Sequence, residues 1–145
     1  MTEKETVVEI QSDEPEKKAP AAWILGTRPD TVSDTVTLTL PDGARHAVPV
    51  EFIYRTREEF GEFWDRVMSS GEGDAPKDEK FSFEKMVGRT DEGDAKRTLE
   101  FVRSWGLDVE LNQENLRLLF NQVAGSAAAL WEAYRTAMVE GRRGN

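Results

Sequence analysis

The fold of this chain is decided in residues 50–60, VEFIYRTREEF, where an alternating strand runs directly into an amphipathic helix. Before Thr56 the apolar residues recur at every second position, and after it they recur at helical spacing. The Thr56 hydroxyl can accept a hydrogen bond from the backbone N–H of Glu59, whose carboxylate can accept one from the N–H of Thr56. This capping box predicts that a helix begins directly after Thr56. Its apolar stripe is Phe60, Phe63, Trp64, Val67 and Met68.

A β-hairpin is predicted immediately before this junction. Thr and large aliphatic residues alternate in residues 35–40, TVTLTL, and the turn-forming sequence PDGA follows at residues 41–44. The return strand is expected at residues 45–54. Pro49 has no backbone N–H, so we expect this strand to lie at a sheet edge or to bulge there. Because a hairpin alone is marginally stable, the helix should pack on it and complete a small α+β unit over residues 22–70.

Residues 81–145 are predicted to form a mainly α-helical region. Residues 71–80, GEGDAPKDEK, precede it as a flexible linker, because they are rich in helix breakers and in charge. Beyond the linker we expect a short helix at residues 81–87 and a longer one at residues 91–105, ended by Gly106.

A helical hairpin is predicted at the end of this region. Asn112 is a good N-cap for one helix, and Gly125 separates that helix from a final one, which Ser126 can cap and Gly141 can end. The fold class is therefore α+β, with an N-terminal hairpin or sheet packed on a helix and a mainly helical C-terminal region. The apolar stripes of the last two helices are Leu116, Leu119, Phe120 and Val123, and Leu130, Trp131, Tyr134 and Met138.

Residues 1–21 have the composition of a disordered acidic tail, because charged and polar residues and Pro outnumber a short apolar island. An alternative is that residues 6–10, TVVEI, add as a strand to a sheet edge. The residues alone do not decide between the two.

The composition narrows the functional classes. A formal net charge of -9 opposes binding to nucleic-acid phosphates, and no apolar run reaches the roughly 18 residues of a membrane span. The first residues are charged and lead into no apolar segment, so no secretory signal is expected. The absence of cysteine suits a reducing cytoplasm. An acidic protein can also expose apolar surface and stay soluble.

Enzymatic activity is not expected. His46 is the only histidine and follows a turn, which favours a surface position over a catalytic or metal-binding one. The phosphate-binding, dinucleotide-binding, zinc-protease, hydrolase and EF-hand spacings do not occur, so we expect no cofactor and no metal.

The remaining candidates for functional residues are large apolar side chains. The chain has four Trp and seven Phe, and several of these lie on or at the end of helical stripes. Most should form the core, but a two-helix hairpin next to a small α+β unit can leave one stripe uncovered, as a groove for an amphipathic helix. The candidate partner-binding residues are Leu116, Phe120, Trp131 and Tyr134.

The sequence resembles the tail assembly chaperones of long-tailed bacteriophages. The resemblance covers residues 45–145 and lies in the strand EFIY followed by RTR at residues 51–57, the WGL break at residues 105–107, the LNQENL helix start at residues 111–116, and the ending from Tyr134. It implies a protein that coats the long, helix-rich tape measure protein in the host cytoplasm and keeps it soluble. It also implies help to the tail tube subunits that polymerise around that client, and departure before the tail is finished.

The resemblance makes the tape measure protein the expected partner, with the C-terminal helical hairpin as the expected contact. The tail tube protein and a second copy of the chain are further candidates. Two alternatives share these sequence features: a structural tail or neck component that stays in the virion, and an acidic mimic of nucleic acid that inhibits a host enzyme. The second requires rigid rows of carboxylates, whereas the acids concentrate in the expected tail and linker.

Overall fold

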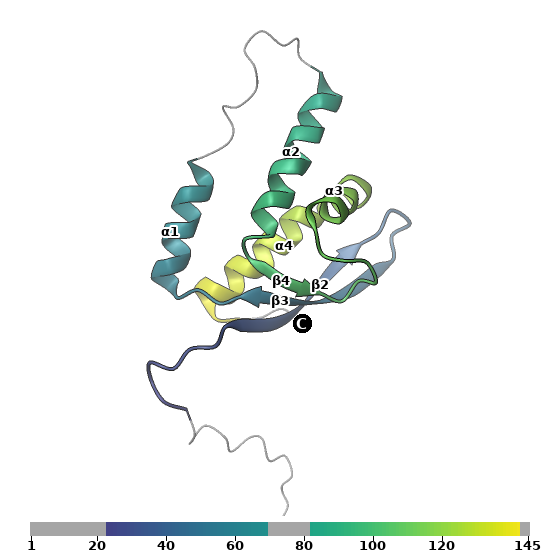
Figure 1. Ribbon diagram of the computed structural model, residues 1–145. Coiled ribbons are helices and arrows are strands. Elements are labelled where there is room, and N and C mark those ends of the chain that lie inside the picture. Colours follow the sequence, from purple (N-terminus) through teal and green to yellow (C-terminus); the bar gives the residue numbers. More distant parts are fainter. Residues whose placement is uncertain (1–22, 70–81, 143–145) are drawn as a thin grey trace, which may run out of the picture.

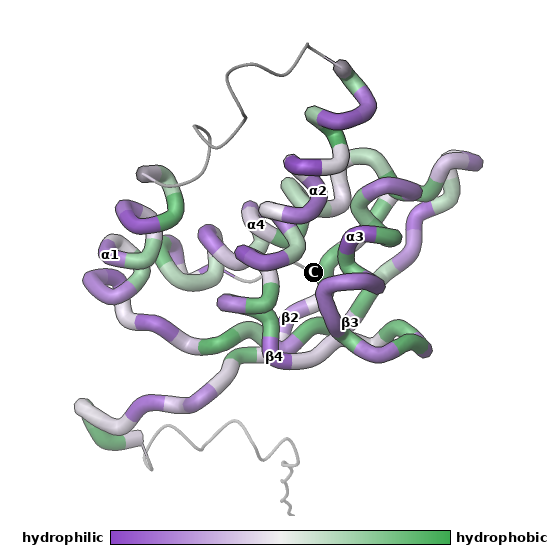
Figure 2. Tube along the Cα trace, turned by 45° about the horizontal axis from the view of Figure 1, so that its top comes forward, coloured by the Kyte–Doolittle hydropathy of each residue, from purple (hydrophilic) through white to green (hydrophobic). Residues whose placement is uncertain are grey.

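A computed structural model describes residues 23–69 and 82–142, which form a three-stranded antiparallel sheet with helices on one face (Figures 1 and 2). The strand order is β2-β3-β4. This architecture confirms the predicted α+β class with a mainly helical C-terminal region. The tail predicted at residues 1–21 and the linker predicted at residues 71–80 lie outside the described residues.

The predicted hairpin consists of β2 (Thr31–Thr39) and β3 (Arg45–Ile53). The two strands pair antiparallel, with Val36 opposite Val48. Successive side chains of a strand point to opposite faces, and Asp34, Val36 and Leu38 on β2 and Val48, Val50 and Phe52 on β3 are accordingly buried. The turn between them needs Gly43, whose φ of +90° is in the left-handed region that favours glycine.

The capping box at Thr56 is present as predicted. The Glu59 backbone N–H donates to Thr56 Oγ1 over 3.1 Å, and the Thr56 N–H donates to Glu59 Oε1 over 3.0 Å. Helix α1 (Arg57–Met68) starts at this cap and buries Phe60, Phe63 and Val67.

The prediction of a helix over residues 91–105 is wrong at its C-terminal end. One continuous helix, α2 (Phe83–Thr98), replaces both the short helix at residues 81–87 and the start of the longer one. After α2 the backbone turns, with the N–H of Phe101 donating to the Thr98 carbonyl, and residues Val102–Trp105 form strand β4.

Strand β4 forms because β3 offers it an open edge. The Ile53 N–H donates to the Phe101 carbonyl over 2.9 Å, and Phe52 and Val50 pair with Val102 and Trp105. A bulge between Glu51 and Phe52 adjusts the register. A segment of only four residues is too short for its pattern of apolar residues to distinguish a helix from a strand. Pairing with the edge of β3 therefore decides that residues 102–105 form a strand.

Strand β3 is central, so the first alternative expected from Pro49, a sheet edge, is wrong; the bulge in β3 lies two residues further on, between Glu51 and Phe52. The Pro49 carbonyl accepts from the Gly106 N–H over 2.8 Å, and in a strand the N–H and C=O of one residue point to the same side. The side of Pro49 that lacks an N–H therefore faces the chain just beyond Trp105, after the last residue of β4 that pairs with β3. A central strand tolerates proline here because no strand partner is lost.

The predicted terminal hairpin is formed by α3 (Gln113–Gln122) and α4 (Ser126–Arg135), and α4 continues into the π-helical segment η4 (Thr136–Glu140). Asn112 caps α3, because its Oδ1 accepts from the Asn115 N–H over 2.8 Å.

The prediction that Ser126 caps the last helix is wrong. Gly125 takes the cap position with a φ of +84°, which the short reversal between the two helices requires. Ser126 is buried, and its hydroxyl donates to the Val123 carbonyl over 2.7 Å. Its side chain therefore bonds the end of α3 instead of the start of α4.

The sheet and the helices share one hydrophobic core. Its centre is an aromatic cluster, in which the rings of Phe101 and Tyr134 stack with centroids 4.7 Å apart. Tyr134 also donates to the Ile53 carbonyl over 2.9 Å and accepts from Arg55 Nη1 over 2.8 Å. The other rings of the cluster are Phe52, Phe60, Phe63, Trp64 and Trp131.

Candidate partner-binding site

Three of the four predicted partner-binding residues lie in the core. Leu116 and Tyr134 are fully buried and Phe120 is nearly so, whereas Trp131 is partly exposed. A partner could reach the first three only if the helices separated. Their role in binding therefore stays a prediction. Of the four predicted residues, Trp131 is the one that is partly exposed in the described conformation.

Trp131 lines a cleft between α1, α2 and α4. Its ring lies 5.5 Å from that of Trp64 and 5.4 Å from that of Phe101. The cleft has a volume of about 220 Å³, and besides Trp131 its lining residues are Met68, Asp94, Arg97, Thr98, Phe101, Ala127 and Ala128.

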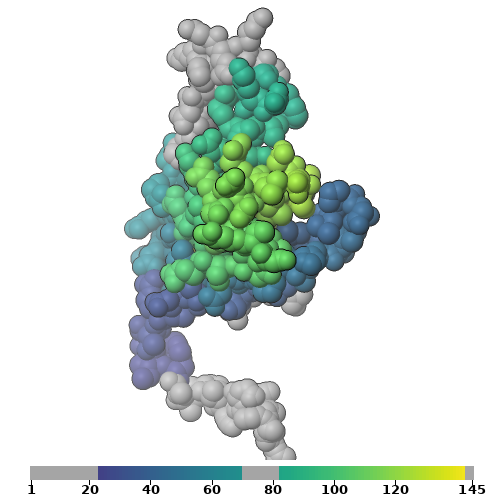
Figure 3. Space-filling model, turned by 45° about the vertical axis from the view of Figure 1, so that its right-hand side comes forward, coloured from purple at the N-terminus to yellow at the C-terminus, as the bar shows by residue number. Residues whose placement is uncertain are grey.

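A larger groove of about 580 Å³ runs between α2 and α3. Figure 3 shows this side of the molecule, with α2 above α3. The apolar part of the groove consists of Phe83 and Val87 on α2 and Leu118 on α3. Phe83 is 65% exposed and Leu118 is 52% exposed, and both side chains line this one groove. The groove thus offers an uncovered apolar surface.

Acidic side chains dominate the charge of this groove. Glu84, Asp91 and Glu114 supply three carboxylates among its lining residues, against one guanidinium, that of Arg117. The pKa of Asp91 is raised, first because it is partly buried and second because Asp94 is close, while Arg117 acts in the opposite direction. A basic group brought next to these carboxylates would be attracted to them.

This geometry suits one class of ligand. An amphipathic helix binds by placing an apolar stripe into a hydrophobic groove, with polar contacts at the edges. Here Phe83, Val87 and Leu118 would contact the stripe, and the carboxylates would pair with Lys or Arg beside it. The α2–α3 groove, defined by these residues, is therefore our candidate partner-binding site.

A family model described as phage tail assembly chaperone matches residues 19–145, nearly the whole chain. The chain belongs to the phage tail assembly chaperone family. The match includes both walls of the α2–α3 groove in this tail assembly chaperone. Comparison with curated proteins and with solved structures gave no match.

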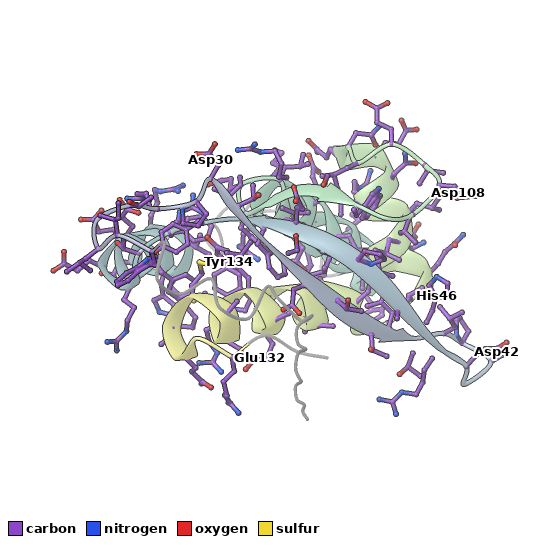
Figure 4. All side chains as sticks on the ribbon, turned by 90° about the horizontal axis from the view of Figure 1, so that it is seen from below. Asp30, Asp42, His46, Asp108, Glu132 and Tyr134 are labelled. Atoms are coloured by element: carbon purple, nitrogen blue, oxygen red, sulfur yellow. The ribbon has the colours of Figure 1, made fainter. Side chains whose placement is uncertain are left out.

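The described part of this chaperone offers no metal site, since it has no group of three His, Cys, Asp or Glu side chains that could hold an ion. None of its described helices is long and apolar enough to cross a membrane. His46 is exposed on β3, where it pairs with Leu38 in the hairpin (Figure 4).

The sequence analysis did not predict the α2–α3 groove, because it chose the candidate contacts from the apolar stripes of the helices, and those stripes are largely buried in the core. Leu118 lies off the buried stripe of α3, and Phe83 was assigned to a short helix next to a linker. The signal was present in the sequence: Leu118 is a large apolar residue that the stripe of Leu116 and Phe120 cannot bury on its face of the helix.

Proposed function

We propose that this phage tail assembly chaperone binds the tape measure protein in the host cytoplasm, keeps it soluble, and promotes assembly of the tail tube around it. It acts by binding, without catalysis, and leaves before the tail is complete, so that it is absent from the mature virion. The tail tube protein is a second proposed partner. The family membership supports the general role, and the α2–α3 groove supports the mode of binding.

The observation that carries this proposal is the pair of exposed apolar side chains, Phe83 and Leu118, on an acidic groove. A tape measure protein is long and rich in helices, so before assembly its apolar stripes face water. Covering such a stripe removes apolar surface from solvent, and this is the favourable term in most protein association. The carboxylates of the groove select helices whose stripe is flanked by basic residues.

The charge of the whole chain supports the second part of the proposal, which is solubility of the complex. A net charge of -9 makes copies of the chain repel one another. A client covered by several such copies acquires a strongly acidic surface. The complex should then remain soluble although each component alone exposes apolar residues.

The test is a matched pair of charge substitutions. Leu118 in the groove and Val109 outside it are each 52% exposed, so Leu118→Glu and Val109→Glu add the same charge at equal exposure. We expect Leu118→Glu to weaken binding to the tape measure protein by about tenfold or more, measured by calorimetry, because a buried apolar contact is worth more than ~1 kcal/mol at such sites. Val109→Glu should bind normally. Equal affinity of the two variants would refute the groove as the binding site.

A further inference from the structure

Three consecutive large apolar residues are exposed on the arm that precedes β2. Trp23, Ile24 and Leu25 expose 64%, 69% and 82% of their surface. Figure 2 shows the arm lying apart from the body, with a hydrophobic (green) stretch in it. Single exposed apolar residues are common, but a contiguous group marks a surface that binds something.

The base of this arm is held in place by polar contacts. Arg28 bonds both carboxylate oxygens of Glu59 at 2.7 and 3.1 Å, and its guanidinium lies over the ring of Tyr54, 5.1 Å from the centroid. The Asp30 carbonyl accepts from the Tyr54 N–H over 2.9 Å, and a turn joins Ile24 to Thr27. The arm is therefore held against α1 and against Tyr54, which follows β3, while Trp23, Ile24 and Leu25 are exposed.

The cleft between α1, α2 and α4 is a receptor of matching chemistry. Its polar groups are already paired, because Asp94 and Arg97 form an ion pair at 2.6 Å and the Thr98 hydroxyl donates to the Asp94 carbonyl over 2.7 Å. What remains is apolar surface of Met68, Ala127, Ala128 and Trp131, above the buried ring of Phe101. A cavity of roughly 150 Å³ accepts benzene, so the cleft, at about 220 Å³, has room for an indole ring or a branched aliphatic side chain.

We propose that the arm of one copy, through Trp23, Ile24 and Leu25, docks in the cleft of a second copy. Figures 1 and 2 both show the arm leaving the body on the sheet side, away from the space between α1 and α2 that the cleft occupies. The arm thus points away from the cleft of its own chain. Donor and receptor are different surfaces of one molecule, so the contact is heterologous and can repeat from copy to copy.

The size of the contact makes it weak when it acts alone. Three such side chains supply roughly 400 Å² of apolar surface, about half of what each partner contributes to a standard stable complex. The free chain should therefore be mostly monomeric and associate only at high concentration. Copies held side by side on one client would associate more strongly, because their local concentration is higher. The stronger association on a client rests on the proposed function, whereas the contact between the arm and the cleft of two free copies does not.

The absence of cysteine from the chain allows a direct test without any client. Ile24→Cys and Ala128→Cys, carried by differently tagged chains, are mixed and oxidised. We expect several-fold more crosslinked heterodimer than in a control mixture of His46→Cys and Ala128→Cys, in which the exposed His46 lies on the hairpin. Equal yields in the two mixtures would overturn the proposal.

Two further measurements complete the test. Trp23→Ser in the Ile24→Cys chain should reduce the crosslink yield, because the largest apolar side chain of the arm is lost; an unchanged yield would contradict docking by this segment. A chain that carries both Ile24→Cys and Ala128→Cys should form crosslinks between chains, and the yield should fall on dilution. A crosslink within one chain, independent of dilution, would show that the arm occupies its own cleft.

Discussion

At the scale of single residues, the chain leaves β4 through a close approach of Gly106 to Pro49. A Cβ on Gly106 would lie 2.7 Å from Pro49 Cδ and 2.8 Å from Cγ, too close for any real side chain. Gly106→Ala should therefore lower the free energy of unfolding by about 1–3 kcal/mol, the usual cost of overpacking, as measured by urea denaturation. Pro49→Ala should restore part of this loss, because it removes both clashing atoms.

Gly93→Ala is the matched control for this prediction. Gly93 lies inside α2, and nothing stands within 4 Å of the position its Cβ would take. Alanine there should stabilise the protein by roughly 0.5–1 kcal/mol, because it favours the helix. Equal changes in stability for Gly106→Ala and Gly93→Ala would show that residue 106 does not need to be glycine because of its close approach to Pro49.

The second prediction at this scale concerns the hydroxyl of Tyr134. Tyr134→Phe removes the donor to the Ile53 carbonyl and the acceptor for Arg55, whose guanidinium also lies 4.0 Å from the centroid of the Phe63 ring. We expect a loss of about 1–3 kcal/mol, because buried polar groups are left unpaired. A double-mutant cycle with Arg55→Met should show a coupling energy of about 0.5 kcal/mol or more. Additive effects would contradict a shared network.

At the scale of elements, the start of α1 makes stability depend on pH. The Arg28 side chain, and then the Thr56 N–H, lower the pKa of Glu59 from 4.5 to about 2. Because the folded state favours the ionised carboxylate, its contribution is complete above pH 4.5 and is lost as pH falls towards 2. Glu59→Gln should therefore lose less stability than the parent between pH 7 and pH 3, measured by the urea midpoint at each pH.

Glu58→Gln is the control for that measurement, since Glu58 lies in the same first turn of α1. It should follow the parent protein over the same pH range. The Arg28–Glu59 pair would be ruled out as a source of the pH dependence if the parent protein and both variants lost the same stability between pH 7 and pH 3.

The elements that sequence reasoning predicted are those that local interactions specify. The capping box at Thr56 and the alternation before it lie within a few residues of each other, so the hairpin and α1 were predictable. Strand β4 was not, because its four residues take strand geometry only when the edge of β3 is available. Long-range pairing has no local signature, and the same limit hid the central position of β3.

The candidate site was less predictable than the fold. The apolar stripes of the last two helices were found correctly, yet Leu116 and Tyr134 turned out to fill the core. Which apolar residue stays exposed depends on which faces the neighbouring elements cover, and that is set by the whole fold. The spacing in α3 places Leu118 off the buried stripe, but it does not show that Phe83 of α2 lies across the same groove.

At the scale of the whole molecule, one core joins both halves of the described chain. The ring of Tyr134 on α4 contacts both Phe52 of the hairpin and Phe63 of α1, so a substitution in either half should affect the whole unit. The α2–α3 groove, our candidate binding surface, lies outside this core. Charge substitutions in the groove should therefore alter client binding with little loss of stability, since exposed positions rarely change it by more than ~0.5 kcal/mol.

The central claim is that this acidic chain holds a long helical client in solution. The most direct test is co-expression of the chain with the tape measure protein of the same phage, followed by size exclusion with light scattering. We predict one soluble complex that contains several copies of the 16.4 kDa chain for each client. An aggregated client beside a free, monodisperse chain would contradict the claim.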